Sequence, residues 1–296
     1  MTKGRTARTA VLALVAVLLS AAAATAAQRT SPDMGQTTLQ PGDLPGAVLA
    51  SHGAGKPKGY VSAYQRTYQL KTPQGSAGIV YIQSAGQLAG TIAKAKTDVQ
   101  LVETSLRTKV GKKLFIAGIA ATVNVKPKAV SVSAVRKPKF GDNAFEQPVS
   151  VLLKGHRVYE DLLYLQLDRV VATLVLAGIH PVTSSAAAKY ATVVMSHITT
   201  ALTPVSTAAP TVTGTAVQGQ TLTAAPGTWS NDDVAFTYQW QHCDATGANC
   251  VDVTGATATT YAVTATDVGF TLRVVATATN RFGAPTAPSV VTAAVA

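Results

Sequence analysis

The sequence predicts a two-domain chain, an α+β domain with an antiparallel sheet and two main helices followed by an all-β sandwich. Period-two segments and amphipathic stretches alternate up to Pro204, whereas only short alternating segments broken by Gly, Pro, Asn and Asp follow. Residues 28–204 contain 20 Lys and Arg against 9 Asp and Glu, and residues 205–296 contain 2 against 5. We therefore expect a basic domain at 28–204, a linker at 205–209 and a sandwich at 210–296.

The first 27 residues have the layout of a secretory signal peptide. Three basic residues open the chain: Lys3, Arg5 and Arg8. An apolar run from about Ala10 to Ala23 follows, and Ala24-Thr25-Ala26 supplies the small residues of a cleavage site. An uncleaved anchor is the alternative, although the run is shorter than the roughly 20 residues of a membrane span. We expect a secreted chain without a transmembrane span, extracellular or associated with the cell envelope.

The C-terminal part alternates buried-type and polar residues within short segments. In "FTYQWQ", Phe236, Tyr238 and Trp240 share one face of a strand. The segment "FTLRVVATATN", residues 270–280, has the same design, so each strand has one buried and one solvated face. About seven such strands in some 90 residues predict a two-sheet sandwich.

Four motifs carry a resemblance: "GQTLTAAPGTWS", "YQWQHCD", "GATATTYAVTATDVG" and "LRVVATATNRFG". Together they resemble the immunoglobulin-like modules of large secreted actinobacterial proteins, over nearly all of residues 209–296. The resemblance implies that Trp240 is the core tryptophan of the central strand and that Trp229 packs after a Pro-Gly turn. The family's disulfide between the two sheets is absent. The implied role is spacing, display or adhesion, without catalytic residues.

The two cysteines of the chain, Cys243 and Cys250, flank the turn-forming loop "DATGAN". If Trp240 points inward, Cys243 has the opposite parity and faces outward. In an oxidising compartment the pair is expected to form a disulfide across a hairpin, which contributes about 2 kcal/mol on the chain-entropy model. A metal site is the alternative, but only His242 and Asp244 offer further ligands, so we expect no metal and no cofactor.

The N-terminal domain divides into strands and two helices. Residues 31–58 are expected to be irregular, and residues 59–70 and 79–83 to form a β-hairpin. A helix is predicted over 84–109, with Ser84 and Gln87 in capping-box spacing, and a second over 184–202. Three strands are predicted within 147–178. The motifs "DLPG" and "GDNAF" and the apolar hairpin before the last helix resemble secreted sensor-like or lipoprotein-type domains of actinobacteria.

The polar residues of this domain do not match a known catalytic motif. The groups considered are His52, His156, His180, His197, Asp142, Glu146, Glu160, Asp161 and Asp168. We interpret the histidines as surface or cap residues, and Glu160 and Asp161, as neighbours on a strand, must face opposite sides. No Gly-x-Ser-x-Gly, His-Glu-x-x-His or Cys nucleophile is present.

Basic residues gather in just over 30 positions and provide the functional hypothesis. The clusters are Arg107, Lys109, Lys112 and Lys113, then Lys126 and Lys128, then Arg136, Lys137 and Lys139. If the chain reverses between them, they form one patch for phosphate-rich or carboxylate-rich polymers or anionic lipid surfaces. The alternative is that they only keep turns solvated. Nucleic acid is not expected as a partner, because no aromatic residues are interleaved with the basic ones.

Three functions follow. The favoured hypothesis is a secreted, non-enzymatic cell-envelope or extracellular protein, whose first domain binds a ligand or an anionic polymer while the second spaces or displays it. A purely structural or adhesive protein that contacts other surface proteins is the second. The third is a secreted hydrolase with an unrecognised site.

Overall fold

The computed structural model describes residues 33–75, 77–231 and 233–296. These residues form two compact units, Asp33–Ala201 and Leu202–Ala296. The predicted signal peptide, residues 1–27, lies outside the described residues. No helix of the described part is long and apolar enough to cross a membrane.

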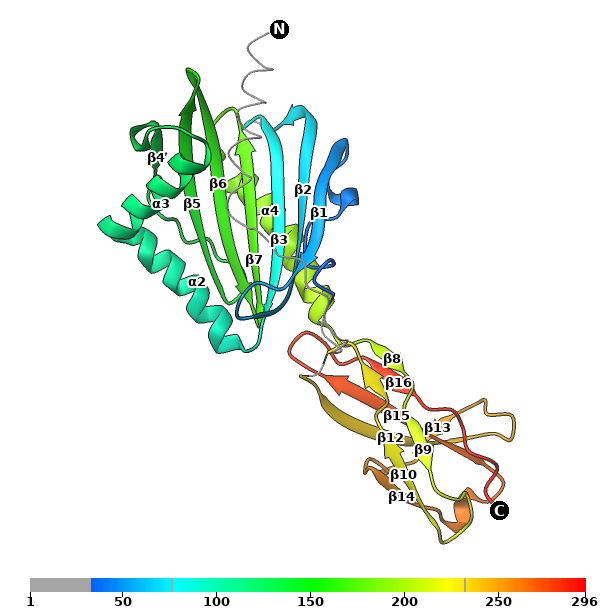
Figure 1. Ribbon diagram of the computed structural model, residues 1–296. Coiled ribbons are helices and arrows are strands. Elements are labelled where there is room, and N and C mark those ends of the chain that lie inside the picture. The colour runs from blue at the N-terminus through cyan, green and yellow to red at the C-terminus, as the bar shows by residue number, and fades with distance from the viewer. Residues whose placement is uncertain (1–32, 76, 232) are drawn as a thin grey trace. The chain divides into compact units, whose positions relative to one another are not determined.

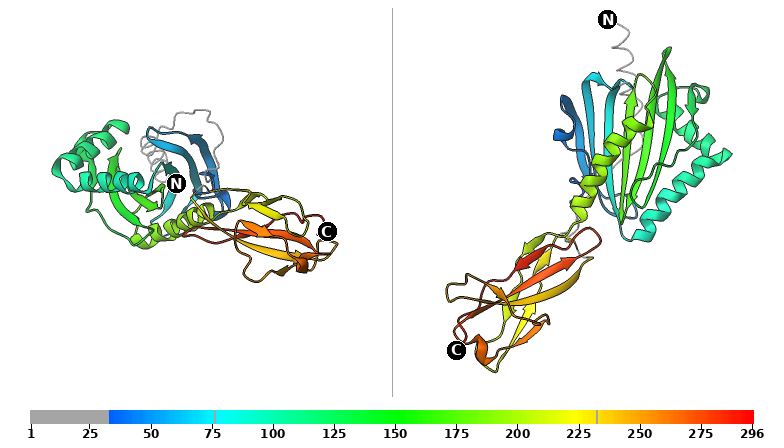
Figure 2. Two further views of the ribbon diagram at one scale, coloured as in Figure 1. Left: turned by 90° about the horizontal axis from the view of Figure 1, so that it is seen from below. Right: turned by 180° about the vertical axis from the view of Figure 1, so that it is seen from behind.

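The first unit is built on a seven-stranded sheet whose neighbouring strands all pair antiparallel, in the order β1-β2-β3-β7-β6-β5-β4. The strands are β1 (Ala47–Gly55), β2 (Tyr60–Gln74), β3 (Ile79–Ala89), β4 (Val130–Val132), β5 (Asn143–Leu153), β6 (His156–Leu167) and β7 (Val170–Gly178). The helices are α2 (Ile92–Arg107), α3 (Lys109–Thr122) and α4 (Ser184–Leu202). Helices α2 and α3 lie over one face of the sheet and α4 crosses the other (Figures 1 and 2). The predicted α+β architecture is therefore confirmed.

The strands β5, β6 and β7 are the centre of this unit because both of their faces are covered. All nine residues of β7 are buried. On the side of α2 and α3, Val149, Val158 and Leu162 pack with Ile119 of α3. The tight turns between these strands occur at Lys154–Gly155 and at Asp168, which adopt positive φ. The prediction of three strands within 147–178 was right.

The helix predicted over 84–109 begins later than expected. Ser84 to Leu88 belong to β3 and pair with β2 on one side and β7 on the other, so their backbone groups are already used in the sheet. Ser84 accepts a hydrogen bond from the Leu39 N–H at 3.1 Å instead of capping a helix. Thr91 is the actual N-cap, and its side chain accepts from the Lys94 N–H at 3.1 Å.

Two further elements differ from the sequence prediction. Residues 47–55, expected to be irregular, form β1, which pairs along β2 with a register shift between Leu49 and Ser51. The first unit also has three α-helices in the described part and not two, because Lys109–Thr122 forms the separate helix α3. Thr108 ends α2 and caps α3, its Oγ1 accepting from the Gly111 N–H at 3.0 Å.

The second unit is a β-sandwich. Its strands are β8 (Ser206–Ala208), β9 (Thr211–Thr213), β10 (Thr221–Ala225), β11 (Thr228–Trp229), β12 (Ala235–Cys243), β13 (Val251–Asp252), β14 (Thr260–Ala262), β15 (Thr271–Thr279) and β16 (Thr286–Pro288). The sheet β14-β10-β9 packs on the sheet β13-β12-β15-β16 through Leu222, Trp240 and Val274. Residues 206–208 of the expected linker pair with β11, so they belong to this unit.

Trp240 is the largest side chain of this core and is completely buried. Its ring stacks on Tyr261 with 5.4 Å between centroids, and its Nε1–H donates to the Ala258 carbonyl at 2.9 Å. Trp229 lies in a separate small cluster beside Phe236, and its Nε1–H donates to Pro226. The buried indoles therefore have the hydrogen-bond partners that their polar groups need.

Candidate functional site

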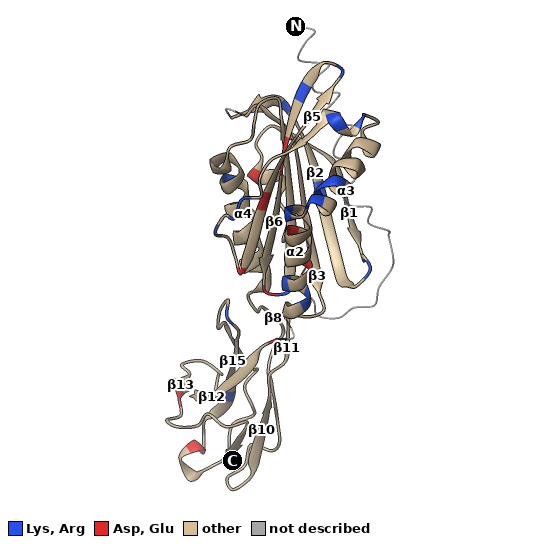
Figure 3. Ribbon diagram, turned by 90° about the vertical axis from the view of Figure 1, so that its left-hand side faces the viewer, with Lys and Arg blue, Asp and Glu red and all other residues tan. Residues whose placement is uncertain are grey.

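Six of the predicted basic residues lie on helix α3 or next to one of its ends. Arg107, Lys109, Lys112 and Lys113 lie where α2 meets α3. At the other end of α3, Lys126 precedes the short 3-10 helix Pro127–Ala129 and Lys128 lies within it. A 14-residue helix is about 21 Å long, so these two groups are separated by roughly that length. Figure 3 shows Lys and Arg segments along α2 and α3.

The carboxylate of Glu103 brings the cluster that contains Lys137 next to the cluster that contains Arg107. This carboxylate on α2 is only 5% exposed. Its Oε1 accepts from Arg107 Nη2 at 2.9 Å and from Lys137 Nζ at 3.1 Å. The chain after β4 therefore returns to the end of α2, and two of the clusters lie side by side.

Arg136 is engaged elsewhere. Its Nη1 lies 2.6 Å from Oε1 of the buried Glu146 and 2.9 Å from Oγ of Ser184 at the start of α4. This geometry ties the segment before β5 to the opposite side of the sheet. Arg136 is therefore a structural ion-pair residue and not a free member of the patch.

Six of the nine predicted residues are left without an ion pair among the described parts of the chain: Lys109, Lys112, Lys113, Lys126, Lys128 and Lys139. Lys112 is half-buried and the other five are exposed. Unpaired cations on one side of a domain attract anions over about 10 Å at moderate salt. We call these six residues the basic surface.

A cavity of about 200 Å³ lies between α2 and the sheet. Its apolar wall comes from valines and a tyrosine of α2, β6 and β7: Val99, Val102, Tyr164, Val171 and Val175. At its polar edge Tyr60 donates to Asp98 Oδ2 at 2.6 Å, and Lys94 Nζ lies 2.8 Å from the same oxygen. The cavity is smaller than the roughly 300 Å³ at which ligand pockets begin.

These polar groups neutralise one another. Burial and the neighbouring Asp98 raise the pKa of Tyr60, so its phenol stays protonated and donates. Burial disfavours the charge of Asp98, but the hydrogen bonds from Lys94 and Tyr60 outweigh it and hold its pKa below the usual value. The arrangement closes the N-terminal end of α2 over β2 and leaves Asp98 with a fixed cation partner.

Sequence reasoning missed a pair of buried carboxyl groups. In the register of β5 and β6, Glu146 lies opposite Leu163, so Asp161 projects from the same face of the sheet as Glu146. Burial, together with the neighbouring Glu146, raises the pKa of Asp161 to about 9. Asp161 is therefore a neutral acid at neutral pH, beside the ion pair of Glu146 and Arg136.

Glu160 projects from the opposite face, as its place next to Asp161 requires. It has the parity of Val158 and Leu162, which pack beneath α3. Burial raises the pKa of Glu160 to about 8. Both carboxyl groups of β6 are therefore neutral acids at mildly acidic pH.

Two histidines of the first unit, His52 and His197, make local contacts. His52 Nδ1 lies 2.8 Å from the Tyr64 hydroxyl on the neighbouring strand. His197 of α4 contacts the Thr38 carbonyl at 2.9 Å and Asp43 at 3.6 Å, which holds the segment before β1 against the helix. Among the described residues, no group of three or more His, Cys, Asp or Glu is arranged to hold a metal ion.

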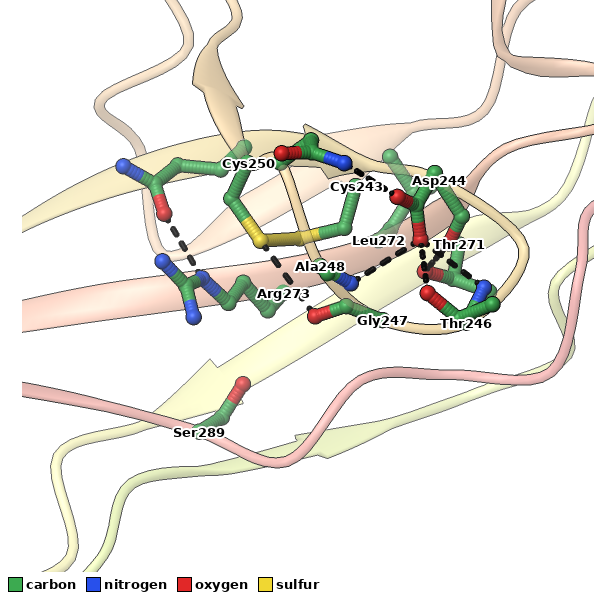
Figure 4. Close-up of a disulfide and its surroundings, with 12 residues drawn as sticks. Cys243, Asp244, Thr246, Gly247, Ala248, Cys250, Thr271, Leu272, Arg273 and Ser289 are labelled. Carbon is green, nitrogen blue, oxygen red and sulfur yellow. Dashed lines mark hydrogen bonds between the residues drawn. A yellow bond between two sulfur atoms is a disulfide. The ribbon is translucent and has the colours of Figure 1, made fainter.

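The cysteines form the disulfide Cys243–Cys250, with sulfur atoms 2.01 Å apart (Figure 4). Asp244 orders the loop between them, because its Oδ1 accepts from Thr246 N at 2.9 Å and from Ala248 N at 3.0 Å. Hydrogen bonds lower the pKa of Asp244 to about 2, and the bond from the Thr246 hydroxyl has the largest effect.

One detail of the cysteine prediction was wrong. Cys243 has the parity opposite to Trp240, but it is buried, with 1% of its surface exposed. The face that Cys243 shares with its strand partner Thr271 is covered there, because Thr271 donates to the Asp244 carbonyl at 2.9 Å and is itself buried. The disulfide therefore joins a buried cysteine, Cys243, to a partly exposed one, Cys250.

Replacing both cysteines tests this role. Cys243→Ala/Cys250→Ala should lower the free energy of unfolding of the second unit by about 2 kcal/mol, because the unfolded chain loses a loop constraint. Both tryptophans of the chain lie in this unit, so their fluorescence during urea denaturation reports on it. The urea midpoint of the wild-type protein should fall by a similar amount in reductant. An unchanged midpoint in both experiments would contradict the stabilising role of the disulfide.

Glu160→Gln tests the buried acid. A raised pKa means that the contribution of Glu160 to stability is fully present below about pH 4, its unfolded value, and is lost as the pH rises towards 8. The wild type should therefore lose about 1 to 3 kcal/mol more than Glu160→Gln between pH 5 and pH 7. Urea denaturation followed at 222 nm measures this, because the α-helices of the described chain lie in the first unit. Equal pH slopes would show that Glu160 is not buried.

Comparison with known proteins adds no functional role to these residues. Neither a protein-family model nor a curated protein matches this chain. The functional argument therefore depends on the geometry of the two units and on the basic surface.

Proposed function

We propose that this chain is an exported, non-enzymatic binding protein of the cell envelope. Its α+β unit binds an anionic envelope component through the basic surface, and its second unit acts as an immunoglobulin-like spacer or display module. The observation that carries the proposal is the group of six lysines that lack an ion pair within the described chain, five of which lie on α3 or just after its C-terminal end. The alternative, that these lysines only keep turns solvated, does not account for their concentration around one helix.

Two features support export and the spacer role. The layout of residues 1–27 is that of a signal peptide, and the Cys243–Cys250 disulfide suits an oxidising compartment. The second unit has two packed sheets with Trp240 between them, as the resemblance to immunoglobulin-like modules implies. Asp244, Asp252, Asp267 and Arg273 are bound to groups of this unit itself, which fits a spacer.

The two other hypotheses differ in what they require. A purely adhesive protein requires partner binding that does not depend on the lysines. A hydrolase requires a nucleophile or a base near a substrate pocket, and the cavity under α2 offers Tyr60 and Asp98. Tyr60 and Asp98 are bound to each other, and Asp98 is also bound to Lys94, so neither group is available to act on a substrate. We therefore favour the polymer-binding hypothesis, which the basic surface supports.

A charge-removal variant tests the proposal. The variant Lys109→Gln/Lys113→Gln/Lys126→Gln/Lys128→Gln should bind polyphosphate or polyglutamate at least about tenfold more weakly than the wild type at low salt, because four unpaired charges are lost. The chain from Gln28 onward, the expected exported form, is used, and affinity is measured against salt concentration. Wild-type binding should weaken as salt rises.

A matched control carries the same change in net charge at exposed lysines outside the basic surface: Lys56→Gln, Lys58→Gln, Lys71→Gln and Lys189→Gln. It should bind nearly as well as the wild type. Equal loss in both variants would mean that only net charge matters, and no loss in either would reject the proposal.

A further inference from the structure

The outward face of α3 is apolar. Val110 and Leu114 are 70% and 68% exposed, and Ala117 and Ala121 continue the same row at helical spacing. The inward face is apolar too, since Phe115 and Ile119 pack against the sheet. A helix that is apolar on two sides is normally covered on both. The exposed row that begins with Val110 and Leu114 is therefore a candidate binding surface.

The charges of α3 define that partner. The helix contains three lysines and no Asp or Glu. Lys109 and Lys113, one turn apart, line one edge of the exposed row, and Lys126 and Lys128 follow its C-terminal end. An exposed apolar row with a cationic edge is the design of helices that lie in the interface of an anionic membrane.

The surface is preformed. Gly111 allows the first turn of α3 to pack closely on the end of α2, because a Cβ at this position would lie 2.1 Å from the Ser105 carbonyl oxygen. The Thr108 cap fixes the same corner. Helix α3 therefore presents Val110 and Leu114 without refolding.

We propose that α3 binds an anionic lipid surface, with Val110 and Leu114 entering the headgroup region and the lysines contacting phosphates. This inference rests on the proposed function and names its partner. A polar polymer satisfies the lysines but leaves Val110 and Leu114 in water, whereas a lipid surface covers both. Basic residues next to anionic lipids each add to the attraction, and buried apolar area adds to it independently.

The experiment compares vesicles of phosphatidylglycerol and phosphatidylcholine with vesicles of phosphatidylcholine alone, using flotation of the chain from Gln28 onward. Wild type should bind the anionic vesicles and not the neutral ones. Val110→Ser/Leu114→Ser should reduce the binding by at least about tenfold, because the apolar contribution is lost. Lys109→Gln/Lys113→Gln should reduce it too and flatten its salt dependence.

The control changes two valines of the second unit that are equally exposed, Val251→Ser/Val290→Ser, at 68% and 78% exposure. It should bind vesicles as the wild type does. The helical signal at 222 nm shows that the first unit of each variant is folded, and tryptophan fluorescence shows the same for the second unit. Vesicle binding that survives Val110→Ser/Leu114→Ser, or that is equal on neutral vesicles, overturns the inference. Binding to polyphosphate without binding to vesicles overturns it and leaves the proposed function standing, whereas loss of both removes both.

Discussion

One buried carboxylate brings two of the three basic clusters of the first unit together. Glu103 would be costly to bury alone, and its cost is offset only because Arg107 and Lys137 both reach it. Arg107 comes from its own helix, but Lys137 comes from the segment between β4 and β5. These ion pairs therefore hold a segment that is far away in sequence beside the end of α2.

The same principle separates structural from available charge. Arg136 is one residue from Lys137, yet it points to Glu146 on the other side of the sheet, where a carboxyl pair needs a cation. Among the predicted patch residues, Arg107, Arg136 and Lys137 stabilise the fold, while the lysines around α3 have no such duty among the described residues. Availability for a ligand is thus decided by which buried acids lie within reach.

The sequence was informative where one local pattern decided the outcome. Strands β5 to β7 and helix α4 were predictable from periodicity, and Cys243 and Cys250 from their loop. Prediction failed where distant partners decided. Ser84 resembles a helix cap, but pairing with two strands keeps it in β3. The Glu146–Asp161 pair depends on a strand register that no local pattern contains.

Helix α3 was missed for a related reason. Its two glycines and its apolar residues on both faces obscure a single stripe, so a simple amphipathic pattern does not appear. The structure explains this pattern, because one apolar side of α3 packs on the sheet and the other is exposed. The two apolar faces, which prevented the prediction of α3, are also the feature on which our inference of a lipid partner depends.

The second unit offers no comparable basic surface, because its basic residues are few and its net charge is negative. Asp267 is buried and accepts from Thr264, Tyr261 and His242, so that its pKa is lowered although burial opposes its charge. Asp244 is held by the disulfide loop. With 2 basic against 5 acidic residues over 205–296, an anionic surface repels this unit and attracts the first. The charge distribution therefore makes the α+β unit the part of the chain suited to the anionic partner that we propose.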